Sequence, residues 1–254
     1  MKFFIKNSIS IIYNFFVKVF PSKGARILMY HSIDSQLSHD TYGISIDFNL
    51  FCKQILLLKS LNYFFIPLDK IHENIGNNKC IIITFDDGYK DNIKAAEFLD
   101  QHKIPFTIFI TSDFVNKSMY LSSSDIKYLN KFNTCTIGAH GKTHNMLAEL
   151  NYSEQLFEIE YCKKFLEEIS STEINQISYP HGSFNNDTIE ICKKLGFKFA
   201  ASSLNGLNNS RNFNAAALKR TEIIASDSLN IFERKINGGF DFMQYKDAFK
   251  MRLK

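Results

Sequence analysis

The feature that most constrains this chain is its alternation of short apolar, β-branched segments with longer segments of helical periodicity. Strands are predicted at 26–30, 80–85, 105–110, 134–139, 176–179, 197–201 and 218–224. Helices are predicted at 47–61, 91–102, 123–131, 152–169, 185–195 and 227–236. Asn185 or Asn186 is the expected N-cap of the fifth helix, and Gly196 its stop. Strands that lack polar alternation are typical of parallel sheets covered on both faces.

Alternation of this kind over 254 residues predicts one α/β domain, built on a barrel or a doubly wound sheet. Hydrophobic residues make up 45% of the chain, which is enough for the core of such a domain. In both folds the chemistry lies at the carboxyl ends of the strands. The candidate site residues are therefore those at the strand ends, together with an arginine in the last strand: His31, Asp86, Asp87, His140, His144, Tyr179, His181 and Arg220.

Asp86 and Asp87 come directly after the apolar segment 80–85 and are followed by Gly88. Two carboxylates in such a place are costly unless they bind something. Successive side chains of an extended backbone point in opposite directions, so one carboxylate can bind a metal ion while the other faces a substrate water. The alternative is structural, because Asp is a favoured N-cap and a predicted helix begins at residue 91.

His140 and His144 follow the segment 134–139, and their spacing puts both on one side of a helical turn. Together with one carboxylate they make a set of three ligands, as in catalytic zinc sites that keep a position open for water. Two histidines and a carboxylate also hold Fe(II) in oxygenases. The ligand types alone leave both metals open.

Three motifs in this order resemble the polysaccharide deacetylase family, which is the NodB homology domain of carbohydrate esterase family 4. They are Thr-Phe-Asp-Asp-Gly at 84–88, His-Gly-Lys-Thr-His at 140–144 and Tyr-Pro-His-Gly at 179–182. The resemblance spans about residues 26–240. It implies an α/β fold, a distorted (β/α) barrel with about seven strands, as a catalytic domain over 23–254 that follows an amphipathic helix over 1–22.

The resemblance also implies a role for each residue of the three motifs. Asp86 is expected to be the catalytic base that deprotonates the attacking water. Asp87, His140 and His144 are expected to bind a divalent metal ion, with Zn²⁺ as the expected ion. The backbone N–H of Tyr179 is expected to help hold the oxyanion.

Two features depart from the family pattern. Many members have an arginine two residues before the proline of the third motif, where this chain has Ser178, and they carry a C-terminal histidine as general acid, whereas no histidine follows His181 here. The run Ile-Leu-Met-Tyr-His at 27–31 resembles a subgroup of exopolysaccharide deacetylases whose motif order is circularly permuted. That likeness implies His31 as the acid; the alternative is a structural histidine beside Tyr30.

Arg220 and His181 are assigned to substrate binding rather than to the chemical step. Arg220 either orients Asp86 in place of the missing arginine or binds an anionic group of the substrate. An exposed arginine beside Lys219 is the structural alternative. His181 stands where this subgroup often has a tyrosine, and we expect it to line the pocket.

Residues 1–20 combine a helical stripe of apolar residues with a polar opposite side. The stripe holds Phe4, Ile5, Ile9, Ile12, Tyr13, Phe16 and Phe20, and the opposite side holds Lys6, Asn7, Ser10, Asn14 and Lys18. The segment is too polar for a membrane span and has no signal-peptide cleavage site. Two interpretations stay open: a helix packed on the domain, or an anchor that lies in the membrane interface.

Charge and cysteine usage narrow the partners and the compartment. The net charge is only +4, and the 30 basic and 26 acidic residues are mixed along the chain. This pattern does not predict a basic surface that binds nucleic acid. Five cysteines without a Cys-x-x-Cys motif argue against a disulfide framework or a thiolate zinc site and favour a reducing compartment. We expect a cytoplasmic protein, peripheral on the membrane if residues 1–20 act as an anchor. The sequence does not indicate an oligomeric state.

Together these features predict a hydrolase that removes an N-acetyl group from an amino sugar of a bacterial surface polysaccharide or of its lipid-linked precursor. The alternatives are a deformylase or another non-peptide amide hydrolase on a different sugar, a non-catalytic glycan-binding relative, and an Fe(II) oxygenase. The complete set of two aspartates and two histidines argues against the non-catalytic relative. Strand–helix alternation argues against the oxygenase, whose sheets are usually antiparallel.

Overall fold

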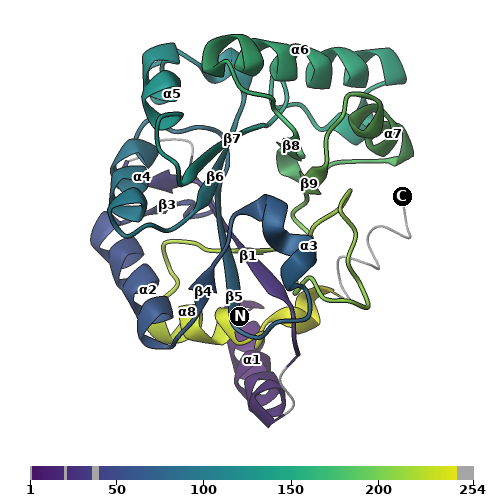
Figure 1. Cartoon of the computed structure of the whole chain (residues 1–254). Coiled ribbons are helices and arrows are strands. Elements are labelled where there is room, and N and C mark those ends of the chain that lie inside the picture. The colour runs from purple at the N-terminus through teal and green to yellow at the C-terminus, as the bar shows by residue number, and fades with distance from the viewer. Residues whose placement is uncertain (1, 20–21, 36–39, 245–254) are drawn as a thin grey trace.

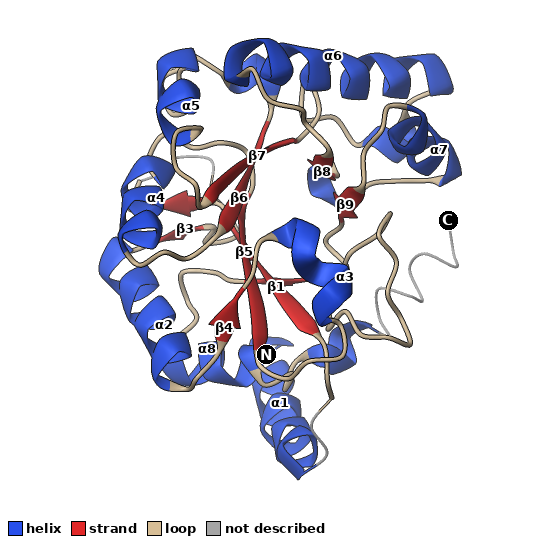
Figure 2. Cartoon of the chain, viewed as in Figure 1, coloured by secondary structure: helices blue, strands red, loops and turns tan. Residues whose placement is uncertain are grey.

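The structure, a computed structural model, describes residues 2–19, 22–35 and 40–244, and its centre is a parallel sheet of eight strands. The strands are β1 (Ala25–Tyr30), β4 (Phe64–Phe65), β5 (Cys80–Phe85), β6 (Phe106–Ile110), β7 (Cys135–Ala139), β8 (Gln176–Ser178), β9 (Phe199–Ala201) and β10 (Arg220–Glu222). Their order is β10-β1-β5-β6-β7-β8-β9, with β4 pairing beside β5. Figures 1 and 2 show the strands at the centre of the molecule and helices around them.

The two ends of the sheet approach each other, so the strands form a nearly closed barrel. Ala201 of β9 bridges in parallel to Leu218, two residues before β10 begins. The N–H of Ser202 donates to the carbonyl of Leu218 at 2.9 Å, and the N–H of Leu218 donates to Ala200 at 2.9 Å. The prediction of a distorted barrel with about seven strands is confirmed, with the two-residue β4 as an addition.

Helices follow most strands and cover the outside of the barrel. They are α2 (Phe48–Ser60), α3 (Ile71–Asn74), α4 (Asn92–Gln101), α5 (Ser123–Leu129), α6 (Tyr152–Ser170), α7 (Asn186–Lys194) and α8 (Leu229–Ile236). The six predicted helices are confirmed, and α7 has Asn185 as its N-cap. The sequence pattern missed α3 and the small sheet of β2 (Ser32–Ile33) and β3 (Ser45–Ile46), because such short elements show no periodicity.

Alternate residues of the barrel strands point to opposite faces, and this places the future site inside the barrel. Ile82 of β5 belongs to the inner apolar cluster with Ile27 and Phe109. Two and four residues after Ile82 come Thr84 and Asp86, both buried. The inner face of β5 therefore changes from apolar to polar towards its carboxyl end, and the polar residues lie above the apolar core of the barrel.

The helix α1 (Lys2–Val19) lies outside the barrel (Figure 1). Ser10 is fully buried, whereas Ile12 and Phe16 of the apolar stripe are 64% and 56% exposed. The helix thus packs on the domain, as the simpler of the two interpretations of residues 1–20 expects, but it does so through its polar side and leaves the apolar stripe exposed. No helix among the described residues combines the length and the apolar character needed to cross a bilayer.

Candidate active site

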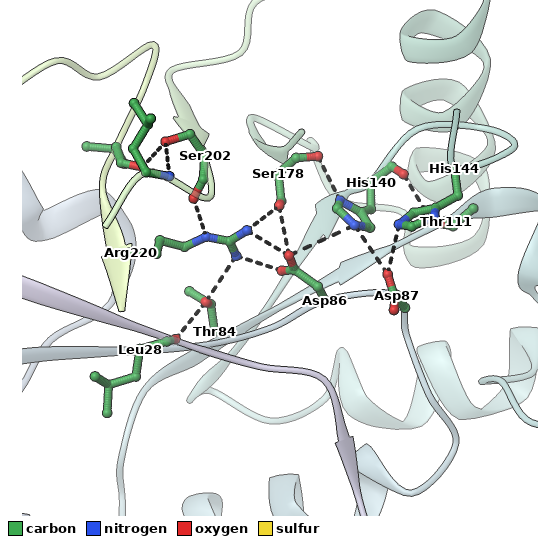
Figure 3. A network of polar contacts seen from close by, with 12 residues as sticks. Leu28, Thr84, Asp86, Asp87, Thr111, His140, His144, Ser178, Ser202 and Arg220 are labelled. Carbon is green, nitrogen blue, oxygen red and sulfur yellow. Dashed lines mark hydrogen bonds and ion pairs between the residues drawn. The ribbon is translucent and has the colours of Figure 1, made fainter. Parts of the chain in front are cut away.

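Asp86 forms a buried, bidentate ion pair with Arg220 at the carboxyl end of the barrel (Figure 3). Arg220 Nη1 donates to Asp86 Oδ1 and Nη2 donates to Oδ2, each at 2.7 Å. The two side chains are 0% and 4% exposed. Arg220 comes from β10 and Asp86 follows β5, so the nearly closed barrel is what brings them together across 134 positions of sequence.

The other N–H groups of Arg220 are also engaged. Nε donates to the carbonyl of Ser202 at 2.8 Å, Nη2 to Ser178 Oγ at 2.8 Å and Nη1 to Thr84 Oγ1 at 3.4 Å. All five guanidinium donors are thereby used, which leaves none for an anionic substrate group. The geometry supports the first of the two predicted roles, the orientation of Asp86, and contradicts the assignment of Arg220 to substrate binding.

The environment of Asp86 keeps its carboxyl ionised. Burial alone would raise the pKa of this carboxyl, but the neighbouring charges of Arg220 and His140 outweigh burial and lower the pKa below its usual value. Ser178 Oγ donates a further hydrogen bond to Asp86 Oδ2 at 3.1 Å. Asp86 is thus a carboxylate of fixed orientation, which is the form that can accept a proton.

Asp87, His140 and His144 form a cluster in which one atom of each lies within 4.8 Å of the others. Asp87 Oδ1 lies 3.3 Å from His140 Nε2 and 3.2 Å from His144 Nε2. The Nδ1 atom of His140 lies 2.8 Å from the carbonyl of Ser178 and donates to it, which leaves the Nε2 lone pair directed at the cluster. These three residues are the ones predicted to bind a metal ion.

Two further observations fit a metal ion at this cluster. Asp87 Oδ1 is buried and accepts no hydrogen bond from the described residues, a state expected of an oxygen that binds a cation. Although burial opposes it, the histidines at 140, 144 and 31 hold the pKa of Asp87 well below its usual range. Two imidazoles and a carboxylate are a ligand set for Zn²⁺ or a similar ion. The structural alternative for Asp86 and Asp87 was that they cap the helix that follows them. It is wrong, because the N-cap of α4 is Asp91.

A left-handed loop, rather than a helical turn, brings the two histidines together. Gly141 and His144 have φ angles of 73° and 68°. Glu158 of α6 holds this loop by accepting the backbone N–H groups of Lys142 at 2.9 Å and Thr143 at 2.8 Å. Sequence reasoning missed Glu158; its signal was an acidic residue on the buried side of a helix, next to Ile159.

The structure corrects the prediction for Tyr179. Its backbone N–H donates to the carbonyl of Ala201 at 3.0 Å as part of the β8–β9 pairing, so it is not available to an oxyanion. Its ring is fully buried, and its hydroxyl donates to the carbonyl of Ala216 at 2.9 Å. Pro180 has no N–H, and the next one, that of His181, donates to no described residue.

His181 lies at the edge of the histidine cluster, on a left-handed residue with φ of 55°. Its ring centroid is 4.4 Å from that of His144, and the residue is exposed to solvent. Burial, followed by the charges of His144 and His140, lowers the pKa of His181. The ring is therefore neutral at pH 7, and its role in lining a pocket stays a prediction.

His31 is the neighbour of Asp86 on the adjacent strand. Tyr30 and Phe85 are in register, and the N–H of Asp86 donates to the carbonyl of Tyr30 at 2.9 Å. Residues in register on parallel strands project to the same side, so His31 and Asp86 face the same space. His31 Nδ1 is buried without a hydrogen-bond partner among the described residues. The predicted acid thus lies beside the predicted base.

A parallel barrel that carries an Asp-His-His cluster next to a second, arginine-bound carboxylate is typical of enzymes that hydrolyse their substrates with a bound metal ion. A family model described as polysaccharide deacetylase matches residues 73–200, half of the chain. The chain belongs to this family. The match includes the aspartate pair and the three site histidines that follow it, whereas His31 and Arg220 lie outside it, so their roles rest on geometry.

Individual relatives agree with this family and with the fold. YxkH of Bacillus subtilis (strain 168), which is assigned to the polysaccharide deacetylases, is 28% identical over 148 residues, or 58% of this chain and 52% of YxkH. The chain thus spans about half the length of this curated relative. The deacetylase PplD of Streptococcus pyogenes superposes with a TM-score of 0.75 at 21% identity, covering 84% of this chain and 98% of PplD. IcaB of Ammonifex degensii superposes with a TM-score of 0.72 at 20% identity, covering 85% of this chain and 98% of IcaB.

Proposed function

We propose that this protein is a metal-dependent hydrolase that removes the N-acetyl group from an amino sugar of a polysaccharide or of its lipid-linked precursor. The observation that carries the proposal is the pairing of two carboxylates with different surroundings. Asp86 is held by Arg220, and Asp87 has a buried oxygen without a hydrogen-bond donor among the described residues. Similarity to polysaccharide deacetylases supports the acyl group and the class of substrate.

The residues divide the chemistry between them. Asp87, His140 and His144 would hold a divalent ion, which when bound lowers the pKa of water and polarises the amide carbonyl. Asp86 accepts the proton of the water that attacks this carbonyl, while Arg220 keeps its two oxygens in one orientation. The free N–H of His181, in place of that of Tyr179, donates to the oxyanion.

Breakage of the C–N bond requires a proton for the leaving amine, and His31 is the residue that supplies it. It lies beside Asp86 on the adjacent strand, so both groups face the same substrate atoms. After the bond breaks, the products are the free amino sugar and acetate. The neutral ring of His181 is suited to a hydrogen bond with a sugar hydroxyl at the edge of the site.

Metal removal tests the proposed function directly. The chelated protein is expected to release no acetate from N-acetylglucosamine oligomers, and added Zn²⁺ is expected to restore release, because the three ligands contribute only with an ion bound. Acetate, formate and bound metal are measured together. Bound zinc without acetate or formate from any amino-sugar substrate would contradict the hydrolase, and formate alone would replace it with a deformylase.

The His31→Asn variant is expected to lose about 10²-fold in kcat on an N-acetyl amino sugar, because a general acid contributes roughly that much or more. The loss should be much smaller on an acetanilide that carries a nitro group, since its weakly basic amine leaves without a proton. Comparing kcat on the two substrates separates a proton donor from a structural histidine. Unchanged turnover, or equal losses on both substrates, would remove His31 from this role.

A further inference from the structure

The outward face of α1 is an apolar surface on a helix whose polar side faces the protein. Five of its large apolar residues, at positions 11, 12, 15, 16 and 19, are between 55% and 68% exposed, and Ile9 is 43% exposed. Amphipathic helices of globular domains normally bury this side and expose the polar one. A contiguous apolar face of this kind marks a surface that binds something else.

Specific contacts hold the polar side of α1 against the domain. Arg234 of α8 donates to the side-chain carbonyl of Asn7. A Cβ atom at Gly239 would lie 3.0 Å from Asn14 Cβ and 3.2 Å from the carbonyl of Ser10, so the helix packs closely on the turn after α8. Tyr13 adds an edge contact to Phe242 at 5.8 Å between ring centroids. The orientation with the apolar face outwards is therefore built into the fold.

We propose that this face docks the protein on the surface of an anionic lipid bilayer, with α1 lying in the interface. The charge of the segment selects this partner. Residues 1–33 contain Lys2, Lys6, Lys18, Lys23 and Arg26, of which Arg26 is paired with Asp241, and no acidic residue, since the first is Asp34. A segment that combines basic residues with an exposed apolar face is typical of an interfacial anchor, and each lysine of the segment adds attraction to anionic lipid. A second copy would bring the same positive charges together.

The place of α1 keeps the candidate active site free. The helix leads into the amino-terminal end of β1, whereas the site residues follow the carboxyl ends of the strands. Docking through α1 would thus hold the barrel on the membrane by the region around α8 while the metal cluster stays open to a glycan. This surface does not depend on the proposed chemistry.

Vesicle flotation with the full chain tests the proposal. We expect binding to vesicles of phosphatidylcholine with phosphatidylglycerol, little binding to phosphatidylcholine alone, and weaker binding at high salt. Phe16→Ser should reduce the affinity about tenfold, as expected for the loss of one buried aromatic side chain. Phe157→Ser is the matched control, because Phe157 of α6 is 57% exposed against 56% for Phe16, and it should bind like the unaltered protein.

Sedimentation without lipid tests whether a second copy of the chain, rather than lipid, binds the apolar face of α1. A dimer of the unaltered chain that Phe16→Ser dissociates would assign the face to a second copy and overturn the proposal. Failure of the full chain to bind either vesicle would overturn it as well, since the face would then be covered by the chain itself or by another partner. Equal loss of binding in Phe16→Ser and Phe157→Ser would show a non-specific effect.

Discussion

Replacing Asp86 by asparagine is expected to lower kcat for acetate release by about 10²–10⁴-fold, the range that general bases contribute. Asparagine has nearly the same shape, but its amide cannot accept the proton of the attacking water. Asp87, His140 and His144 are untouched, so the bound metal should stay near one equivalent. Acetate release and metal content, measured on the same preparation, check both parts of the prediction.

The Asp86→Asn variant needs a control because it also disturbs a buried ion pair. Asp241 forms the same bidentate pair with Arg26 at the other end of β1, with both contacts at 2.9 Å. Asp241→Asn should lose stability for the same reason, since an amide N–H then faces the guanidinium, yet it should keep its kcat. A kcat equally low in both variants would mean that the loss reflects a damaged fold and that Asp86 is not the base.

The barrel and its rim could be predicted because their signals are local. Wholly apolar segments specify buried parallel strands, and the residues that end them must then meet at one rim. His140, His144 and Asp87 were found in this way, since each directly follows or closely follows a strand. Arg220 was predicted from its strand position, because it lies two residues after Leu218 and should therefore face inward, although its partner could be identified only once the barrel was nearly closed.

The parts that could not be predicted depend on contacts between distant segments. The N–H of Tyr179 pairs with Ala201 because β8 and β9 are neighbours, and no motif states which N–H groups of a strand end stay free. Glu158 reaches its loop from the next helix along the chain. The helix was predicted correctly over residues 2–19, but periodicity shows only that a helix has two sides. Which side faces the protein depends on Arg234 and Gly239, more than 200 residues later.

The Arg220→Met variant is expected to lose about 3–5 kcal/mol of unfolding free energy, the usual cost of leaving one partner of a buried ion pair alone. That is a large part of the roughly 5–15 kcal/mol of a typical domain. Both oxygens of Asp86 would lose their donors on Arg220 in a place with 4% exposure. Urea unfolding at pH 7 measures the loss, and the Arg26→Met variant is the matched control. It should lose less, because Asp241 is 16% exposed and can regain water.

The pH dependence distinguishes the two arginines further. The pKa of Asp86 in the folded protein is lowered, so the stability that this carboxylate contributes is complete above its unfolded pKa of about 4 and is lost as the pH falls through the folded value. Without Arg220, burial raises the pKa of Asp86 instead, and the acidic limb of kcat/KM should move to higher pH because the base protonates sooner. Arg26→Met should leave the acidic limb of kcat/KM unchanged, because Asp241, the partner of Arg26, lies outside the site. Acidic limbs that coincide in the two variants would show that Arg220 stabilises the barrel without tuning the base.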